Sequence, residues 1–174
     1  MKDRQIVDSS FTSIINAPIE KVDIPEWCFN LSEQEYQSCS PAHVSAGSTS
    51  TPEGKRMSIN VEIIGGSLMV QHYIETIGQK DHLLLNSESD VFTPAGRTKI
   101  HVTWELSVKD IGKGRCEFTN RVRSYATEEM LMFLDRQGIP FDQFRAQRQP
   151  ASIAHNRGET PMFAASIERA ALRS

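Results

Sequence analysis

The sequence predicts an α+β fold in which a curved antiparallel sheet of six or seven strands packs against C-terminal helices. The first observation is a series of short segments between residues 56 and 125, each with alternating apolar and polar residues and each followed by a turn. Alternation is clearest over residues 98–109, and a period of two is typical of a strand with one buried and one solvated face. The second observation is that helical patterns follow this region. Consecutive strands followed by helices indicate an α+β domain.

Length and composition exclude several functional classes. The chain has 174 residues, which is enough for one domain with its own core, and we expect a single domain over residues 1–174. The net charge is −3 and the basic residues are scattered, so we expect no nucleic-acid partner. The polar N-terminus is unlike a signal peptide, and no segment approaches the ~20 apolar residues of a membrane span. We therefore expect a cytoplasmic protein, with a homodimer left open.

Cysteine and histidine spacing gives no sign of a metal or a cofactor. The three cysteines are far apart and include no C-x-x-C pair, which argues against a disulfide framework or a zinc site. The histidines lack the H-x-x-x-H spacing of helical ligands, so we expect no metal site and no cofactor. The five are His43, His72, His82, His101 and His155.

The N-terminal third predicts one strand, two short helices and an edge strand. Residues 6–16 are rich in β-branched side chains, and Asn16-Ala17-Pro18 ends this strand. Pro18 and Pro25 can each open a short helical piece, and Ser32 with Glu35 has the form of a capping box for the next. Residues 43–54 are rich in Ser, Thr and Gly and predict an irregular edge strand followed by a loop.

The central region predicts five strands joined by tight turns. Gly65-Gly66 is a strong hairpin signal between strands at 57–63 and 68–74. Strands at 83–92, 98–109 and 116–124 follow. We expect the apolar parity of each strand to face the interior, which would turn Ile59, Val61, Val70 and His72 inward.

The C-terminal third predicts helices interrupted by proline and glycine. Thr127 can cap a first helix, and Gly138 occupies the position of a left-handed C-terminal cap. We expect Pro150 to kink or split a second helix over residues 141–157, and Pro161 to open a last one. The polar segment 155–160 then becomes a hydrated turn between helices, with a ligand gate or a subunit contact as the alternative.

This order of elements resembles the START-like superfamily of helix-grip proteins (SRPBCC, Bet v 1-like), which includes lipid-transfer domains, plant pathogenesis-related proteins and bacterial polyketide cyclases. The resemblance rests on the turn Asn16-Ala17-Pro18-Ile19-Glu20-Lys21-Val22, the strands and the terminal helix, and it covers nearly the whole chain. It implies an elongated cavity between the concave face of the sheet and the last helix, which usually holds a hydrophobic small molecule. The broken terminal helix predicted here departs from the single long helix of the family.

Polar residues on the apolar parity are the candidate binding residues. If each hairpin closes symmetrically about its turn, one row across the concave face contains His72, Ser87, Trp104 and Asn120, because cross-strand partners lie about 5 Å apart. Polar groups buried without a partner cost about 1–3 kcal/mol each, so such a row must bond internally, to water or to a ligand. The predicted ligand-binding set is His72, Ser87, Ser89, Trp104, Asn120, Phe163 and Ile167, with the last two covering the cavity.

Three functional hypotheses follow. The first is binding of a hydrophobic or aromatic small molecule without chemistry. The second is a polyketide cyclase or hydrolase in which His72 serves as acid or base, since imidazole titrates near neutrality. The third is a protein-interaction module with a filled core. A cavity below about 300 Å³ would exclude a drug-sized ligand and would favour the third.

Overall fold

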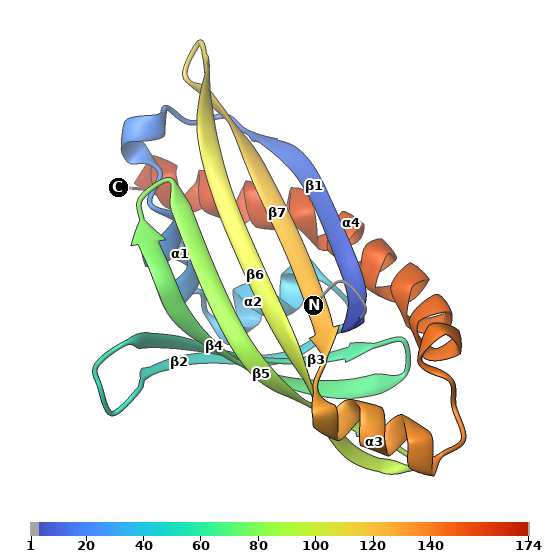
Figure 1. The fold of residues 1–174 in the computed structure, drawn as a ribbon. Helices are drawn as coiled ribbons and strands as arrows, with labels where there is room; N and C mark the ends of the chain where they lie inside the picture. The colour runs from blue at the N-terminus through green and yellow to red at the C-terminus, as the bar shows by residue number, and fades with distance from the viewer. Residues whose placement is uncertain (1–3, 174) are drawn as a thin grey trace.

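The structure, a computed structural model that describes residues 4–173, consists of one seven-stranded antiparallel sheet with helices across its concave face (Figure 1). The predicted α+β helix-grip class is confirmed. Residues 1–3 and 174, the ends of the expected domain, lie outside the described residues. Across the sheet the strands are β1 (Gln5–Ile15), β7 (Arg115–Ala126), β6 (Gly96–Gly112), β5 (His82–Thr93), β4 (Ser67–Gln79), β3 (Arg56–Ile64) and β2 (His43–Ser50).

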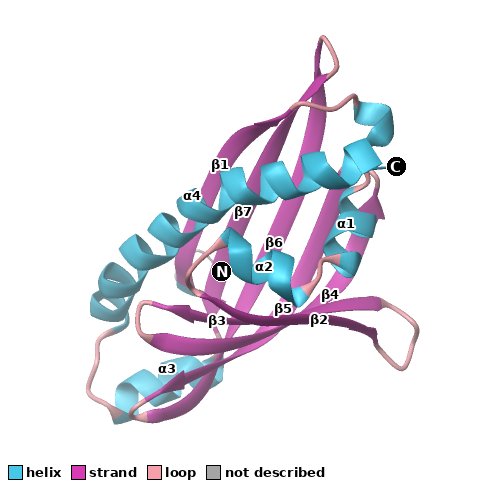
Figure 2. Cartoon of the chain, turned by 180° about the vertical axis from the view of Figure 1, so that it is seen from behind, coloured by secondary structure: helices cyan, strands magenta, loops and turns pink. Residues whose placement is uncertain are grey.

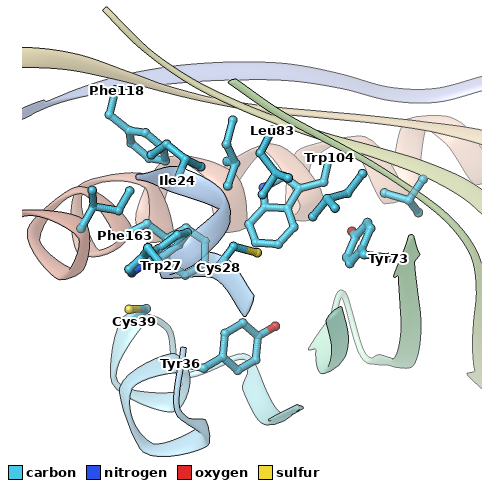
Figure 3. Packing of buried hydrophobic residues seen from close by; sticks show 14 of the residues in the cluster. Ile24, Trp27, Cys28, Tyr36, Cys39, Tyr73, Leu83, Trp104, Phe118 and Phe163 are labelled. Atoms are coloured by element: carbon cyan, nitrogen blue, oxygen red, sulfur yellow. The ribbon is translucent and has the colours of Figure 1, made fainter. Parts of the chain in front are cut away.

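The predicted short helices after β1 are present and capped by their own side chains. A 3₁₀ turn, η2 (Ile19–Lys21), precedes α1 (Ile24–Asn30) and α2 (Glu33–Cys39). Ser32 caps α2 by accepting a hydrogen bond from the Glu35 backbone N–H at 3.2 Å. On α1, Trp27 meets Phe163 edge to face at 5.4 Å and its indole N–H donates to Ser166. These contacts join α1 to the C-terminal helix within the core shown in Figure 3.

Alternation in β5, β6 and β7 matches the predicted burial. Leu83 and Leu85 of β5 and Trp104 and Leu106 of β6 are buried toward the helices. Tyr73 of β4 packs against Trp104, with the two ring centroids 5.3 Å apart. Figure 3 shows both side chains. The long strands therefore form the predicted apolar wall.

The predicted facing of β3 and β4 is wrong. In β3 the polar residues of the alternation are buried, and in β4 the buried residues are those that alternate with Val70 and His72. Ile59, Val61, Val70 and His72 are themselves half-exposed. A period of two identifies two faces but does not say which one is inside, and here the interior itself carries polar groups. The inward residues are Ser58, Asn60, Glu62, Met69, Gln71 and Tyr73.

The C-terminal third contains two helices, α3 (Glu128–Arg136) and α4 (Phe141–Arg173). Thr127 caps α3 by accepting from the Met130 backbone N–H at 3.1 Å, and Gly138 ends it with a φ of +66°. The expected division into a helix over residues 141–157 and a last helix that opens at Pro161 is wrong, because Pro150 and Pro161 both lie inside α4. Both prolines are exposed and eleven residues apart, which is close to three turns, so they share the solvent side. The helix bends instead of ending there, as Figure 2 shows.

Helix α4 lies mainly against β1 and crosses the concave face of the sheet (Figure 2). Helix α3 packs beside β6 near the β5–β6 turn. Among the helices of residues 4–173, none is long and apolar enough to cross a membrane.

Candidate functional site

A cavity of about 340 Å³ lies between the concave face of the sheet and helices α3 and α4. Its walls are mainly apolar and come from every strand except β2. Trp104 and Phe163, whose ring centroids lie 5.8 Å apart, border its inner end. Prominent apolar wall residues elsewhere are Met69, Val102, Met130 and Phe133.

The cavity opens between the β5–β6 turn and the connection from α3 to α4. Of the lining residues, Pro94 and Ala95 in that turn and Gln137 and Ile139 in that connection are exposed. Lining residues from the middle of the strands are buried. The mouth therefore lies beside α3, and the opposite end is bordered by α4 and by Glu62 near the end of β3.

Two buried polar atoms in the cavity wall have no hydrogen-bond partner among the described residues. These are Oε1 of Gln71 and Oγ1 of Thr98, in side chains that are 4% and 0% exposed. Both residues line the cavity. An unmet polar atom of this kind costs about 1–3 kcal/mol.

Arg148 places a cation in the wall without a carboxylate opposite it. Its guanidinium donates to the Ile64 backbone oxygen and lies 3.0 Å from the Met69 sulfur, and it forms no ion pair with any described carboxylate. Burial lowers the pKa of Arg148. Gly65 makes room for this side chain: a Cβ there would lie 3.1 Å from Nη1 of Arg148. The wall thus offers an anion a partly buried cation as its partner.

The inner end of the cavity contains four ionisable side chains from three elements. His43 opens β2, Glu62 faces inward from β3, and His155 and Glu159 lie one turn apart on α4. The i, i+4 spacing on α4 directs both of its residues to the same side. His43, Glu62 and Glu159 are buried and His155 is nearly so. Three of the four line the cavity: Glu62, His155 and Glu159.

The four groups are close enough to control one another's protonation. Nε2 of His43 and Nε2 of His155 lie 3.1 and 3.2 Å from the same oxygen of Glu159. Burial acts to raise the pKa of Glu159, but hydrogen bonds from His155 and His43 outweigh it and lower that pKa to about 2. Burial acts to lower the pKa of His155, and its bond to Glu159 raises it to about 9. Burial and the nearby Glu159 charge raise the pKa of Glu62.

Solved structures share this arrangement of sheet and helices. The Zhui aromatase/cyclase from Streptomyces sp. R1128 has a TM-score of 0.66 with 10% identity, over 95% of this chain and 93% of that one. A START superfamily protein from Mycobacterium smegmatis has a TM-score of 0.53 with 13% identity, over 95% and 97% of the two chains. The chain has the START-like helix-grip fold.

Norcoclaurine synthase from Thalictrum flavum shares the helix-grip fold, with a TM-score of 0.51 and 10% identity over 96% of this chain and 87% of that one. No family model matches the sequence, and no curated protein matches it. The helix-grip assignment therefore rests on the structure and not on sequence identity.

The structure distributes the predicted binding residues over three environments. Trp104 and Phe163 line the cavity. Asn120 and Ile167 are buried outside its wall. Asn120 accepts a hydrogen bond from the Trp104 indole at 2.9 Å and donates to Glu159 at 3.1 Å, so it supports the polar cluster from behind.

The predicted polar row is not formed as expected. His72 is half-exposed and absent from the cavity wall, so its expected inward position is wrong. Ser87 and Ser89 are buried and bond to each other at 2.9 Å, and Ser87 also accepts from the backbone N–H of His72 at 2.8 Å. Ser87 pairs with Val102, two residues from Trp104, because the observed register is offset from the symmetric one.

Sequence reasoning missed the four-residue cluster. His155 and Glu159 form an H-x-x-x-E pair, which has the same helical geometry as H-x-x-x-H but lacks the second histidine. The expected hydrated turn at 155–160 is wrong, since this segment is helical with Asn156, Glu159 and Thr160 buried. Because Ile59 and Val61 predict the inward parity of β3, Glu62 falls on the parity expected to be solvated, whereas the structure buries it. Three segments distant in sequence supply the cluster, so spacing along any one of them gives only part of it.

Proposed function

We propose that this helix-grip protein binds a small, largely apolar or aromatic molecule in the cavity. The observation that carries the proposal is a continuous, mainly apolar space of about 340 Å³ that reaches the surface and has Arg148 in its wall. Small-molecule sites are typically apolar pockets of about 300–1,000 Å³ with a few convergent polar groups. The aromatase/cyclase with a similar fold carries a name that fits a role in handling aromatic compounds.

The ligand we propose has an acidic group that meets Arg148. That guanidinium is partly buried in the wall and faces no described carboxylate, and a carboxylate or similar anion on the ligand would supply a charge-assisted hydrogen bond. The apolar wall around Val102 and Met130 would hold its hydrocarbon part.

Two alternatives are less well supported. A filled-core interaction module does not account for a cavity of this size. A cyclase or hydrolase that uses His72 lacks its acid–base residue at the cavity, because His72 lies on the outer parity of β4. Binding is therefore the function that the geometry favours.

The test uses two probes, the fluorescent dye 1-anilinonaphthalene-8-sulfonate and its competitor 2-naphthoate. Val102 and Ser124 face each other across β6 and β7 and both line the cavity. We expect Val102→Phe and Ser124→Leu each to weaken binding of both probes at least tenfold, because their added atoms occupy the cavity. His101→Phe, on the exposed face of β6, is the matched control and should bind as the parent does.

Unchanged dye affinity in both filled variants, with their melting temperatures maintained, would overturn the proposal. Native mass spectrometry of the purified protein gives a second readout. A co-purifying compound of small-molecule mass should be present in the parent protein and depleted in Val102→Phe.

A further inference from the structure

The four ionisable side chains at the inner end of the cavity have the arrangement of metal ligands. One ligand atom from each of His43, Glu62, His155 and Glu159 lies within 4.8 Å of all the others. Neither histidine pairs with a single glutamate, because Nε2 of each one lies within 3.8 Å of both Glu62 and Glu159. The four groups therefore surround a common centre and do not form two separate ion pairs.

The spacing of the ligand atoms fits a tetrahedral ion. The four nitrogen–oxygen separations are 3.1, 3.2, 3.6 and 3.8 Å. A zinc ion with bonds of about 2.0–2.1 Å to nitrogen and oxygen requires tetrahedral edges of about 3.3–3.4 Å. The two separations to Glu62 involve different oxygens of that residue, and the four ligand atoms lie within 4.8 Å of one another, so a contraction of the cluster by up to roughly 1 Å would complete the site.

Hydrogen bonding at His43 directs a lone pair at the centre. Nδ1 of His43 lies 2.6 Å from the Tyr36 backbone oxygen, which can only accept, so Nδ1 carries a proton. In the neutral imidazole, Nε2 then presents its lone pair to carboxylate oxygens of Glu159 and Glu62 at 3.1 and 3.6 Å. A lone pair cannot face two anionic oxygens unaided, so Nε2 carries either a second proton, which bonds to Glu159, or a metal ion.

An outer layer of hydrogen bonds holds the remaining ligands in place. Tyr36 donates from its hydroxyl to Glu62, and its ring stacks on His43 at 3.8 Å. Asn120 donates to the other oxygen of Glu159 at 3.1 Å. Carbonyl, hydroxyl and amide partners of this kind orient the ligands in established metal sites.

We propose that His43, Glu62, His155 and Glu159 bind one divalent transition-metal ion, with zinc as the preferred species. Two imidazoles and two carboxylates suit zinc, and the two glutamate charges would balance the charge of the ion. Glu62, His155 and Glu159 also line the cavity, so the ion would be accessible from the ligand chamber. Four protein ligands would complete a tetrahedral shell, so the ion could polarise a carbonyl group or activate water only if it expanded to five ligands or released one glutamate.

The test measures zinc binding to the full chain after removal of metals with a chelator. Zinc is titrated in competition with a chromophoric chelator, and cobalt(II) is added separately, because its visible absorption reports the number and geometry of its ligands. We expect one zinc ion per chain and a cobalt spectrum typical of tetrahedral coordination. Glu159→Gln and His155→Gln should each weaken zinc binding by about 100-fold or more, since loss of an outer-layer partner alone costs 10–100-fold.

The matched controls are His82→Gln and Glu105→Gln. These residues form a histidine–glutamate pair of the same 3.1 Å length at the surface, remote from the cavity. We expect both to bind zinc within twofold of the parent. Glu62→Gln retains the shape of its side chain and its hydroxyl partner, so it should remain folded, bind zinc weakly and show no zinc-dependent rise in melting temperature.

Two results would overturn the metal site: no zinc bound by the parent at micromolar concentrations, or equal affinity in the cluster variants and the surface controls. Either outcome would identify the cluster as a protonated hydrogen-bond network. The dye-binding test of the proposed function uses metal-free protein, so failure of one proposal is distinguishable from failure of the other.

Discussion

Asn120→Ala should lower the free energy of unfolding far more than the loss of one small uncharged side chain would suggest. Asn120 is fully buried and accepts from the Trp104 indole N–H at 2.9 Å. It also donates to Glu159 at 3.1 Å and to Thr160 at 3.3 Å. Alanine leaves a buried N–H and a buried carboxylate oxygen without these partners. At about 1–3 kcal/mol for the neutral group and more for the charged one, we expect a loss of about 3–5 kcal/mol.

Equilibrium urea unfolding, followed by tryptophan fluorescence and circular dichroism, measures this loss. Asn86→Ala is the matched control, because Asn86 also makes two side-chain hydrogen bonds, to Thr76 and Thr103, but is exposed on the outer face. Surface substitutions of this kind change stability by about 0.5 kcal/mol or less. A loss below about 1 kcal/mol in Asn120→Ala, or equal losses in the two variants, would refute the reasoning.

Three further predictions follow from single residues. Gly158→Ala should raise the free energy of unfolding by about 0.5–1 kcal/mol, because Gly158 lies inside α4 and a Cβ there meets no atom within 4 Å; an unchanged urea midpoint would contradict it. Burial raises the pKa of the Cys28 thiol to about 12, that of Cys39 to about 11, and that of Cys116. Because these thiols stay protonated at pH 8, none should react rapidly with Ellman's reagent until guanidinium unfolds the protein; fast labelling of the native state would show otherwise. Arg148→Met should weaken binding of 2-naphthoate but leave 2-naphthamide unaffected, and equal weakening of both would exclude an ionic role.

Local signals predicted most of the fold. Ser32 and Thr127 cap the helices that follow them, and Gly138 has the positive φ of a helix C-terminus. The strand at 98–109 alternates as its sequence indicates. These features depend on a few neighbouring residues, whose preferences the surrounding structure reinforces.

The terminal helix and the two strands β3 and β4 could not be predicted in the same way. Pro150 and Pro161 break hydrogen bonds in an isolated helix, but packing of α4 on the sheet maintains the helix across both. On β3 the apolar residues Ile59 and Val61 lie on the half-exposed face, and Glu62 faces inward because its partners come from α2, β2 and α4. Those partners exist only in the folded chain.

The inward face of β3 is the strongest reason to regard the polar cluster as functional. Removal of two carboxylates and two imidazoles from water costs several kcal/mol per charge, and apolar side chains of similar size would stabilise the same space at lower cost. The outer face of β3 already has the apolar residues that a conventional core would use, among them Ile59 and Val61. A reversed strand would bury them and expose Glu62. Retention of the unfavourable arrangement, supported by Tyr36 and Asn120, is explained if the cluster has a partner that offsets its desolvation, and a divalent ion at its centre does so directly.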